Sequence, residues 1–461
     1  MDTISYLNLK VEGFPFTKIL SVQINHRPND HGVAVVEGEV NAVQAQDLMQ
    51  RVDETLRVSI ITTAEDQPGR LFCGCVKDIF LKQENAYSII TLSLYTTSRL
   101  LDVTKKKKTY QQVSQTYEQI ITDSISEVGD LHMMVTDKAI GQLIMKYNET
   151  DWEFAMRMAS QLGAPLVADI ASPRTQLYVG LPPSRKTIKI ESSSFGYGGN
   201  VDSLAKLTGS MAQDFAGEQA RSYQYAFIGD MVSMNGKSMR IKGVNAVLAD
   251  GILCMSYELM QANGSMAGIA VPKTVSRASG KMMKGTVKAV NMDKVQVHVT
   301  DIDKAYDSGG DWWFPFSTAY SSSDGSGWYC MPEVGDEVRV FFPSGQEGEA
   351  FAASSVYSCP PQNPRHKSWK APGGKEILLT DDGMYIIGKS GKIYINLTDE
   401  KGIEIYSDKE INIMSDTRVS ISAASEVDIV ASNEIIIGTE EAYIDLNKSS
   451  AVLAASEVLI N

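Results

Sequence analysis

The chain has 461 residues, of which 43% are hydrophobic, and its formal net charge is −13 at pH 7. A chain of this length predicts three or four domains rather than one. It contains no apolar run long enough to cross a bilayer, and its first residues lack the basic start and apolar core of a signal peptide. We therefore expect cytoplasmic synthesis and folding and, if the protein is exported, a route other than general secretion.

The acidic charge is concentrated toward the C-terminus. Residues 376–461 contain 16 Asp and Glu against 6 Lys and Arg, a net charge of −10. Such a surface repels nucleic acid and anionic lipid, so we expect no nucleic-acid partner. The one basic run, residues 105–108, is predicted to be a solvated loop.

Cysteine and histidine usage gives little sign of a metal or redox site. The odd number of cysteines, five, argues against a disulfide framework and indicates a reducing compartment. Among the five histidines only His26 and His31 are close, and a solvated loop is favoured there over a metal site. No nucleophile elbow is present. We expect no catalytic residue, no metal and no cofactor.

Residues 1 to about 100 have the alternating pattern of β-strands, separated by Gly, Asn, Asp and Pro. The predicted strands are residues 5–11, 19–24, 32–38, 56–62, 70–80 and 87–95. This pattern is typical of a small barrel or curled sheet. Residues 114–128 then change to helical spacing, which predicts an amphipathic helix.

A second helix is predicted where Thr150 and Glu153 form a capping box. Its apolar stripe consists of Trp152, Ala155, Met156, Ala159 and Leu162. A capped helix packed on a barrel needs no ligand, so this segment does not by itself indicate a binding site. Strands resume after Gly163.

Residues 280–357 predict about five short strands, which fits a small Greek-key barrel of the OB type. Many such barrels bind single-stranded nucleic acid through aromatic residues beside a basic groove. The aromatic residues here have no cluster of Lys or Arg beside them, so we interpret them as core and interface residues. Residues 358–375 are rich in Pro and Gly and are predicted to be a linker.

Residues 376–461 contain apolar residues at steps of eight. A second stripe lies two places further on, and residues i and i+2 of a strand share a face, so each unit presents an apolar pair inward. The predicted inward residues are Leu379, Ile387, Ile395, Ile403, Ile411, Ile413, Val419, Ile421, Val427, Ile429, Ile435, Ile437, Tyr443, Ala451 and Leu459. Because Ile444 and Val452 also follow the step, the register is expected to slip by one after Ile437.

Such short units in one chain leave unpaired strand edges. We therefore predict an intertwined homotrimeric β-helix, with these residues along its axis. The alternative is a meander of antiparallel hairpins.

Residues 383–390 match the phosphate-loop pattern G-x-x-x-x-G-K-[ST]. In a true P-loop the glycine-rich segment exposes its backbone to phosphate and opens a helix. Here its variable positions are Met384, Tyr385, Ile386 and Ile387, and an apolar strand follows. We interpret it as part of the repeat, with nucleotide binding as the alternative.

With these parts in place, nearly the whole chain resembles the VgrG family, the spikes of type VI secretion and related contractile injection systems. Residues 147–154 are similar to the family segment Y-x-E-[ST]-D-x-x-F, and Trp328 with residues 332–338 resembles the family's barrel signature. Residues 348–357 resemble the family's run into a terminal G-S-V-Y-N segment, while residues 290–294 depart from its usual turn. A phage-like tail baseplate hub and spike is the related alternative.

This resemblance implies a hub at residues 1–275 with two barrel-like subdomains, an OB neck and a trimeric spike at residues 376–461. It implies docking on an inner tube of Hcp-like hexamers, contacts with baseplate subunits, a PAAR-like tip protein and effector cargo. The tip protein is expected to dock on Val458, Leu459, Ile460 and Asn461. The predicted function is a non-enzymatic spike that punctures a target envelope; an adhesin or tail fibre, and a P-loop or cell-wall-degrading enzyme, are the alternatives of other classes.

Overall fold

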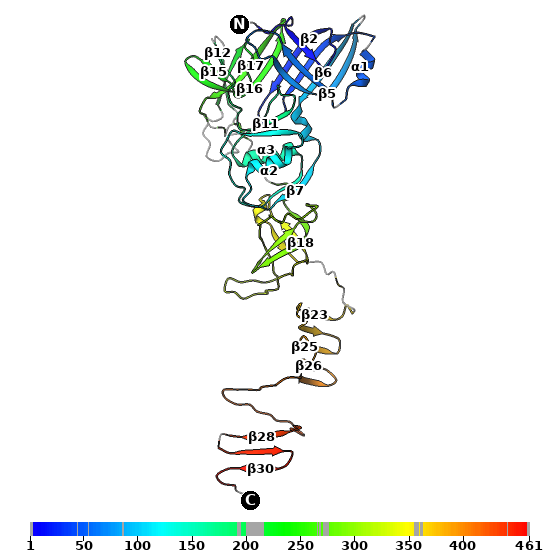
Figure 1. Ribbon diagram of the computed structural model, residues 1–461, viewed down its shortest axis with the longest axis vertical. Coiled ribbons are helices and arrows are strands. Elements are labelled where there is room, and N and C mark those ends of the chain that lie inside the picture. The colour runs from blue at the N-terminus through cyan, green and yellow to red at the C-terminus, as the bar shows by residue number, and fades with distance from the viewer. Residues whose placement is uncertain are drawn as a thin grey trace. The chain divides into compact units, whose positions relative to one another are not determined.

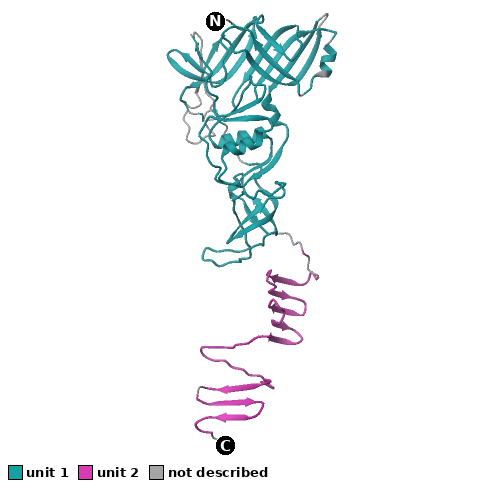
Figure 2. Ribbon diagram, viewed as in Figure 1, with its two compact units in different colours: residues 1–356 teal, residues 357–461 magenta. Residues whose placement is uncertain are grey.

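A computed structural model describes residues 3–43, 45–53, 55–84, 87–190, 195–199, 216–264, 266, 269–270, 276–354, 359, 363–439 and 441–458. The chain divides into two compact units, residues 1–356 and residues 357–461 (Figure 2). The structure is mainly β, as predicted (Figure 1). Within the described ranges, no helix has the length and apolar character needed to cross a membrane.

The first unit contains a large curved sheet (Figure 1). Its twelve strands are hydrogen-bonded along the path β1-β4-β5-β6-β3-β2-β16-β17-β14-β13, with β12 and β15 paired beside β16. The strands are β1 Leu9–Glu12, β2 Lys18–His26, β3 Val33–Val40, β4 Arg57–Thr62, β5 Arg70–Glu84, β6 Tyr87–Thr96, β12 Thr187–Ile190, β13 Phe195–Gly199, β14 Ala216–Ser222, β15 Met231–Met234, β16 Lys237–Ala249 and β17 Ile252–Gln261. Along β3 and β6, buried residues alternate with residues that are less buried, so each strand has one buried face. This alternation is the pattern that predicted these strands.

A separate core forms around two helices, α2 Tyr117–Ile125 and α3 Asp151–Gln161. Both predicted helices are confirmed, and each begins with a complete capping box. Around them lie the 3-10 helix η1 Thr97–Asp102 and the strands β7 Lys106–Tyr110, β8 Gly129–Met133, β9 Ile144–Glu149, β10 Leu166–Ala168 and β11 Thr175–Val179. Helix α1, Ala45–Arg51, was not predicted.

The basic run at residues 105–108 is largely a strand rather than the predicted loop. β7 pairs with β9, and its lysines form salt bridges to Asp151 from Lys106 and to Asp123 from Lys108.

The last part of the first unit is a five-stranded sheet with the order β20-β19-β18-β21-β22. Its strands are β18 Lys281–Asn291, β19 Lys294–His298, β20 Phe314–Pro315, β21 Glu337–Phe342 and β22 Phe351–Ala353, and the 3-10 helix η3 Glu347–Glu349 precedes the last of them. Val287, Val297, Val340 and Phe342 are fully buried in its core. The predicted small barrel is confirmed.

The second unit consists of antiparallel strands in sequence order. One sheet contains β23 Lys367–Lys370, β24 Glu376–Leu379, β25 Gly383–Ile387, β26 Ile393–Thr398 and β27 Gly402–Ser407. Another contains β28 Glu434–Gly438, β29 Tyr443–Asn447 and β30 Ala451–Ala454. Within one chain, the repeat is thus a meander, the form considered as the alternative to a β-helix.

His26 is buried on β2, the strand that joins the two halves of the large sheet by pairing with β16. Neither ring nitrogen has a hydrogen-bond partner of acceptable geometry in the described structure. Burial lowers the pKa of this imidazole to about 4, with Asp169 partly opposing the shift.

We predict that acid destabilises this sheet through His26. Between pH 6.5 and pH 4 the unfolded chain binds a proton that the folded chain excludes, so the free energy of unfolding falls by about 3 kcal/mol at most. Substitution of His26→Leu should remove this part of the pH dependence in chemical denaturation experiments. If the pH dependence of the His26→Leu variant is unchanged, His26 is accessible to protons in the folded protein. The free energy of unfolding of the variant at pH 7 gives the cost of the substitution itself.

Candidate spike surface and hub–neck junction

The register of the second unit gathers apolar side chains on one face of its first sheet. Ile377 pairs with Ile386, which pairs with Ile395, which pairs with Ile405. Paired residues of antiparallel strands share a face, so these side chains lie side by side. The neighbouring row on the same face contains Leu379, Met384, Leu397 and Ile403. We call this surface the spike face; its residues are Ile377, Leu379, Met384, Ile386, Ile395, Leu397, Ile403 and Ile405.

The spike face is largely open to solvent within one chain. Seven of its eight residues are among the exposed large hydrophobic side chains, and Ile403 is 72% exposed. The opposite face is more polar, with stacked Tyr394 and Tyr406 and a hydrogen bond from the Tyr394 hydroxyl to Glu404. Exposed contiguous apolar surface of this kind marks an interaction site.

The structure brings Leu379, Ile395 and Ile403 of the predicted stripe together, but it places Ile387 on the opposite face. Ile387 pairs with Tyr394, and its neighbour Ile386 occupies the spike face instead. The cause is the hairpin turn, because an antiparallel turn sets whether residues eight apart fall on the same or opposite faces.

Residues 408–433 connect the two sheets of the second unit and form no strand themselves. The chain bends at residues 408–409, 416–417, 424–425 and 432–433, which are eight apart. The predicted residues of this segment are all exposed: Ile411, Ile413, Val419, Ile421, Val427 and Ile429. The segment therefore has the predicted eight-residue unit without ladder partners for its backbone within the described chain.

In the second sheet of this unit, the residues that share a face are not all those of the predicted eight-residue stripe. Ile435 and Ile437 share a face with Ile444, Leu446, Ala451 and Leu453. Tyr443 lies on the other face, opposite Gly438. The expected one-residue slip is found at Ile444 only, because Val452 pairs with Asp445 on the opposite face while Ala451 stays on the face of Ile444. Val458 is exposed, whereas Leu459, Ile460 and Asn461 lie outside the described residues.

The apparent phosphate loop forms β25 and the turn after it. Lys389 and Ser390 lie in the turn, and β26 follows with its residues paired to β25. No helix begins there, so the segment lacks the helix N-terminus that holds phosphate in a P-loop.

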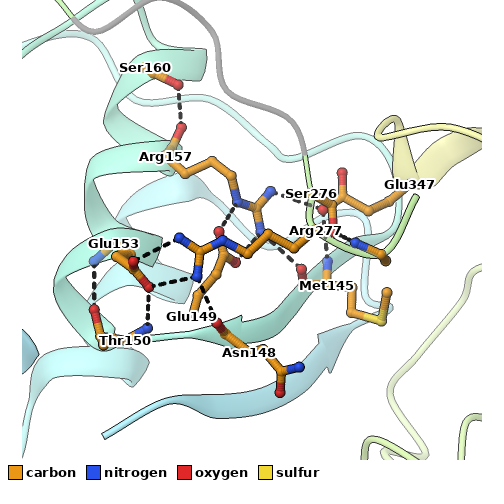
Figure 3. Close-up of polar contacts among 11 residues, drawn as sticks. Met145, Asn148, Glu149, Thr150, Glu153, Arg157, Ser160, Ser276, Arg277 and Glu347 are labelled. Atoms are coloured by element: carbon orange, nitrogen blue, oxygen red, sulfur yellow. Dashed lines mark hydrogen bonds and ion pairs between the residues drawn. The ribbon is translucent and has the colours of Figure 1, made fainter. Parts of the chain in front are cut away.

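A buried polar cluster joins the helical part of the first unit to its OB domain (Figure 3). Arg157 of α3 donates two hydrogen bonds of 2.8 Å to Glu149, one of 2.9 Å to Glu347 and one of 2.9 Å to the Met145 carbonyl. Glu347 also accepts a hydrogen bond from the Met145 N–H, at 3.3 Å. Burial lowers the pKa of the Arg157 guanidinium, but Glu347 and Glu149 outweigh this effect and hold the pKa above its ordinary value.

Three further contacts cross the same junction. Arg277 donates to both carboxylate oxygens of Glu153 and to the Asn148 carbonyl (Figure 3). Asp303 accepts hydrogen bonds of 2.8 Å from the Thr109 N–H and 2.5 Å from its hydroxyl. Asp311 accepts one of 2.8 Å from the Val113 N–H. Sequence reasoning found Thr150 and Glu153 as a helix cap, but it missed Arg157, Glu347 and Asp303.

A constellation that resembles a hydrolase triad is buried. The His31 Nδ1 atom is 2.8 Å from the Ser98 Oγ atom, and its Nε2 atom is 3.5 Å from Asp102. Ser98 is only 1% exposed, so this hydroxyl is not accessible to a substrate. His31 also lies 4.2 Å from Trp152, centroid to centroid, which makes it part of the packing. Among the residues that the structure describes, no group of three or more His, Cys, Asp or Glu is suited to hold a metal.

The comparisons with known proteins agree with this architecture. The family described as the type VI secretion system/phage-baseplate injector OB domain matches residues 283–357. An Escherichia coli component of the type VI secretion system, itself structurally similar to the T4 bacteriophage tail proteins gp27 and gp5, is 13% identical with a TM-score of 0.58. The match covers 76% of this chain and 99% of that one.

A second solved structure matches a larger share of this chain. The Francisella PdpA–VgrG complex in its half-lidded form contains a chain that is 9% identical with a TM-score of 0.54, and the match covers 86% of this chain and 87% of that one. No curated protein matches by sequence.

The chain therefore shares the fold of these two solved structures over most of its length. Residues 283–357 match the type VI secretion system/phage-baseplate injector OB domain, and the predicted resemblance to VgrG is confirmed at the level of the fold. The solved structures it resembles are described as a type VI secretion system component and a VgrG complex.

We predict that Glu347→Ala loosens the OB domain from the helical core. Removing one partner from a buried ion pair costs about 3–5 kcal/mol, because the remaining charge stays desolvated. Amide exchange in β9, where the Met145 N–H would lose its acceptor, should become faster, and the OB domain should melt earlier in calorimetry. Glu349→Ala, which removes an exposed carboxylate bonded to Ser344, is the matched control; equal behaviour of the two variants would contradict the coupling role.

Proposed function

We propose that the protein is the non-enzymatic spike of a contractile injection system, acting as a homotrimer that punctures a target envelope and carries cargo. The observation that carries this proposal is the spike face together with residues 408–433. Both leave apolar side chains exposed in one chain, and residues 408–433 also leave backbone groups without ladder partners.

Intertwining with other copies would bury the exposed apolar side chains and pair the backbone groups that lack ladder partners. Each backbone without a partner can pair with its counterpart from another copy, so that no strand edge is left open. The apolar stripes then merge into a continuous dry core, and each fully buried Ile contributes about 1.5–3 kcal/mol. Three is the number of copies that the resemblance to VgrG implies.

The resulting needle would suit a mechanical role. A rod whose edges are all paired resists local unfolding, and the net charge of −10 on residues 376–461 would keep its outer surface hydrated. Within each copy, the buried Arg157 cluster would couple the neck to the helical part of the hub, so that a push on the hub reaches the spike.

The partners follow from the same proposal. We place an inner tube of Hcp-like hexamers on the hub at residues 1–275, with baseplate subunits around it. A PAAR-like tip protein would dock at Val458 and the residues that follow it, and export would occur by contraction. VgrG of the Francisella structure is in complex with PdpA, which supports an effector or other protein partner here.

The trimer axis is tested by charge substitution at two adjacent positions. Ile413→Asp would bury three carboxylates near one another on the axis, each costing on the order of several kcal/mol. Light scattering should then report loss of the trimer, and limited proteolysis should cleave the spike. Met414 is 90% exposed and follows Ile413 in an extended segment, so its side chain faces away, and Met414→Asp should leave the trimer intact. A stable, protease-resistant trimer of Ile413→Asp would overturn the axis assignment.

A further inference from the structure

The OB domain carries an exposed arm that its own fold does not use. Residues 317–331, which we call the neck arm, run between β20 and β21. All residues from 317 to 330 are exposed, and Tyr329 is 72% exposed. Tyr320 and Trp328 are also exposed aromatic residues.

The neck arm is nevertheless held in one shape. The Trp328 N–H donates to the Tyr320 carbonyl and the Ser322 N–H to the Ser326 carbonyl, each at 2.8 Å. The Tyr329 hydroxyl ties the arm to the body of the domain by donating 2.9 Å to the Met292 carbonyl. A surface that is ordered before binding loses less conformational freedom on association.

The composition of the arm is that of a protein-recognition surface. Ten of its fifteen residues are Ser, Gly, Tyr or Trp, and Asp324 is its only charged residue. Tyrosine and tryptophan supply large contact areas at low entropic cost, and Ser and Gly supply adaptable hydrogen bonds. Exposed aromatic residues on a preorganised hairpin therefore indicate a docking element.

Charge indicates what the arm docks on. Residues 305–338 contain six acidic residues and no basic residue, whereas residues 276–292 contain four basic residues and no acidic one. The second segment includes β18, where Lys281, Lys284 and Lys288 are exposed beside Met282. Lys284 already pairs with Glu337 of its own chain. Each OB domain thus has an aromatic arm flanked by acidic residues on both sides, and a basic strand with an exposed methionine.

We propose that the neck arm of one copy docks on the β18 surface of the neighbouring copy, so that the necks of the trimer close head to tail. This inference rests on the homotrimer proposed above. The arm with its acidic flanks and the basic β18 surface have opposite charge. An interface between two different patches on identical subunits builds a ring when its rotation closes. Each copy uses its arm once and its β18 surface once, which leaves neither exposed.

The native cysteines permit a direct test. Cys330 is exposed on the arm, and Cys359 is the other exposed cysteine. In a Cys359→Ser background, Lys281→Cys places a second thiol on the β18 surface. Mild oxidation should then produce covalent trimers on non-reducing gels. The reason is that every contact between an arm and a β18 surface has Cys330 on one side and the cysteine introduced by Lys281→Cys on the other. The same background without Lys281→Cys can form dimers at most, and Lys10→Cys, on exposed β1, is the matched control.

The outcomes separate this inference from the proposed function. Covalent trimers that need both Cys330 and Lys281→Cys support head-to-tail docking. A protein that is trimeric by light scattering but gives only monomers, or as many trimers with Lys10→Cys, overturns the arm assignment and leaves the spike proposal standing. A protein that is monomeric before oxidation overturns the proposed homotrimer.

Discussion

The second unit depends on one constraint, which is that a polypeptide backbone must pair its N–H and C=O groups wherever it buries an apolar stripe. Residues 408–433 place Ile413, Ile421 and Ile429 along an extended chain without ladder partners. Water can satisfy this backbone only while the apolar side chains also remain in water. Burying the stripe therefore requires strands from other copies, which is the physical basis of the proposed homo-oligomer.

In the first unit, separate hydrophobic cores must be held together. Its large sheet, helical core and OB domain each have their own buried cluster. Between the last two lies Arg157, whose charge is offset by Glu149 and Glu347 from either side of the junction. A buried charge tolerates little displacement of its partners, because any unpaired position leaves it desolvated. Such a junction suits a molecule that we propose carries load.

The helices and strands that could be predicted from the sequence are those marked by patterns within a few neighbouring residues. The helix around Tyr117 and the helix capped by Thr150 were predicted, since capping and helical spacing lie within a few residues. The strands of β4 to β6 and the OB domain were predicted from alternation. Helix α1 has only seven residues and little periodicity, and the lysines of β7 resemble a loop until β9 and its acidic neighbours are beside them.

The sequence by itself determined the eight-residue unit, its apolar pairs, the acidic charge of residues 376–461 and the resemblance of nearly the whole chain to VgrG. Tertiary structure alone decided which side chains share a face. It moved Ile387 and Tyr443 off the stripe, because each turn, rather than the period, sets the register of an antiparallel pair. It also joined Arg157 to Glu347 across 190 residues, a contact that no local pattern encodes because it exists only when two cores meet.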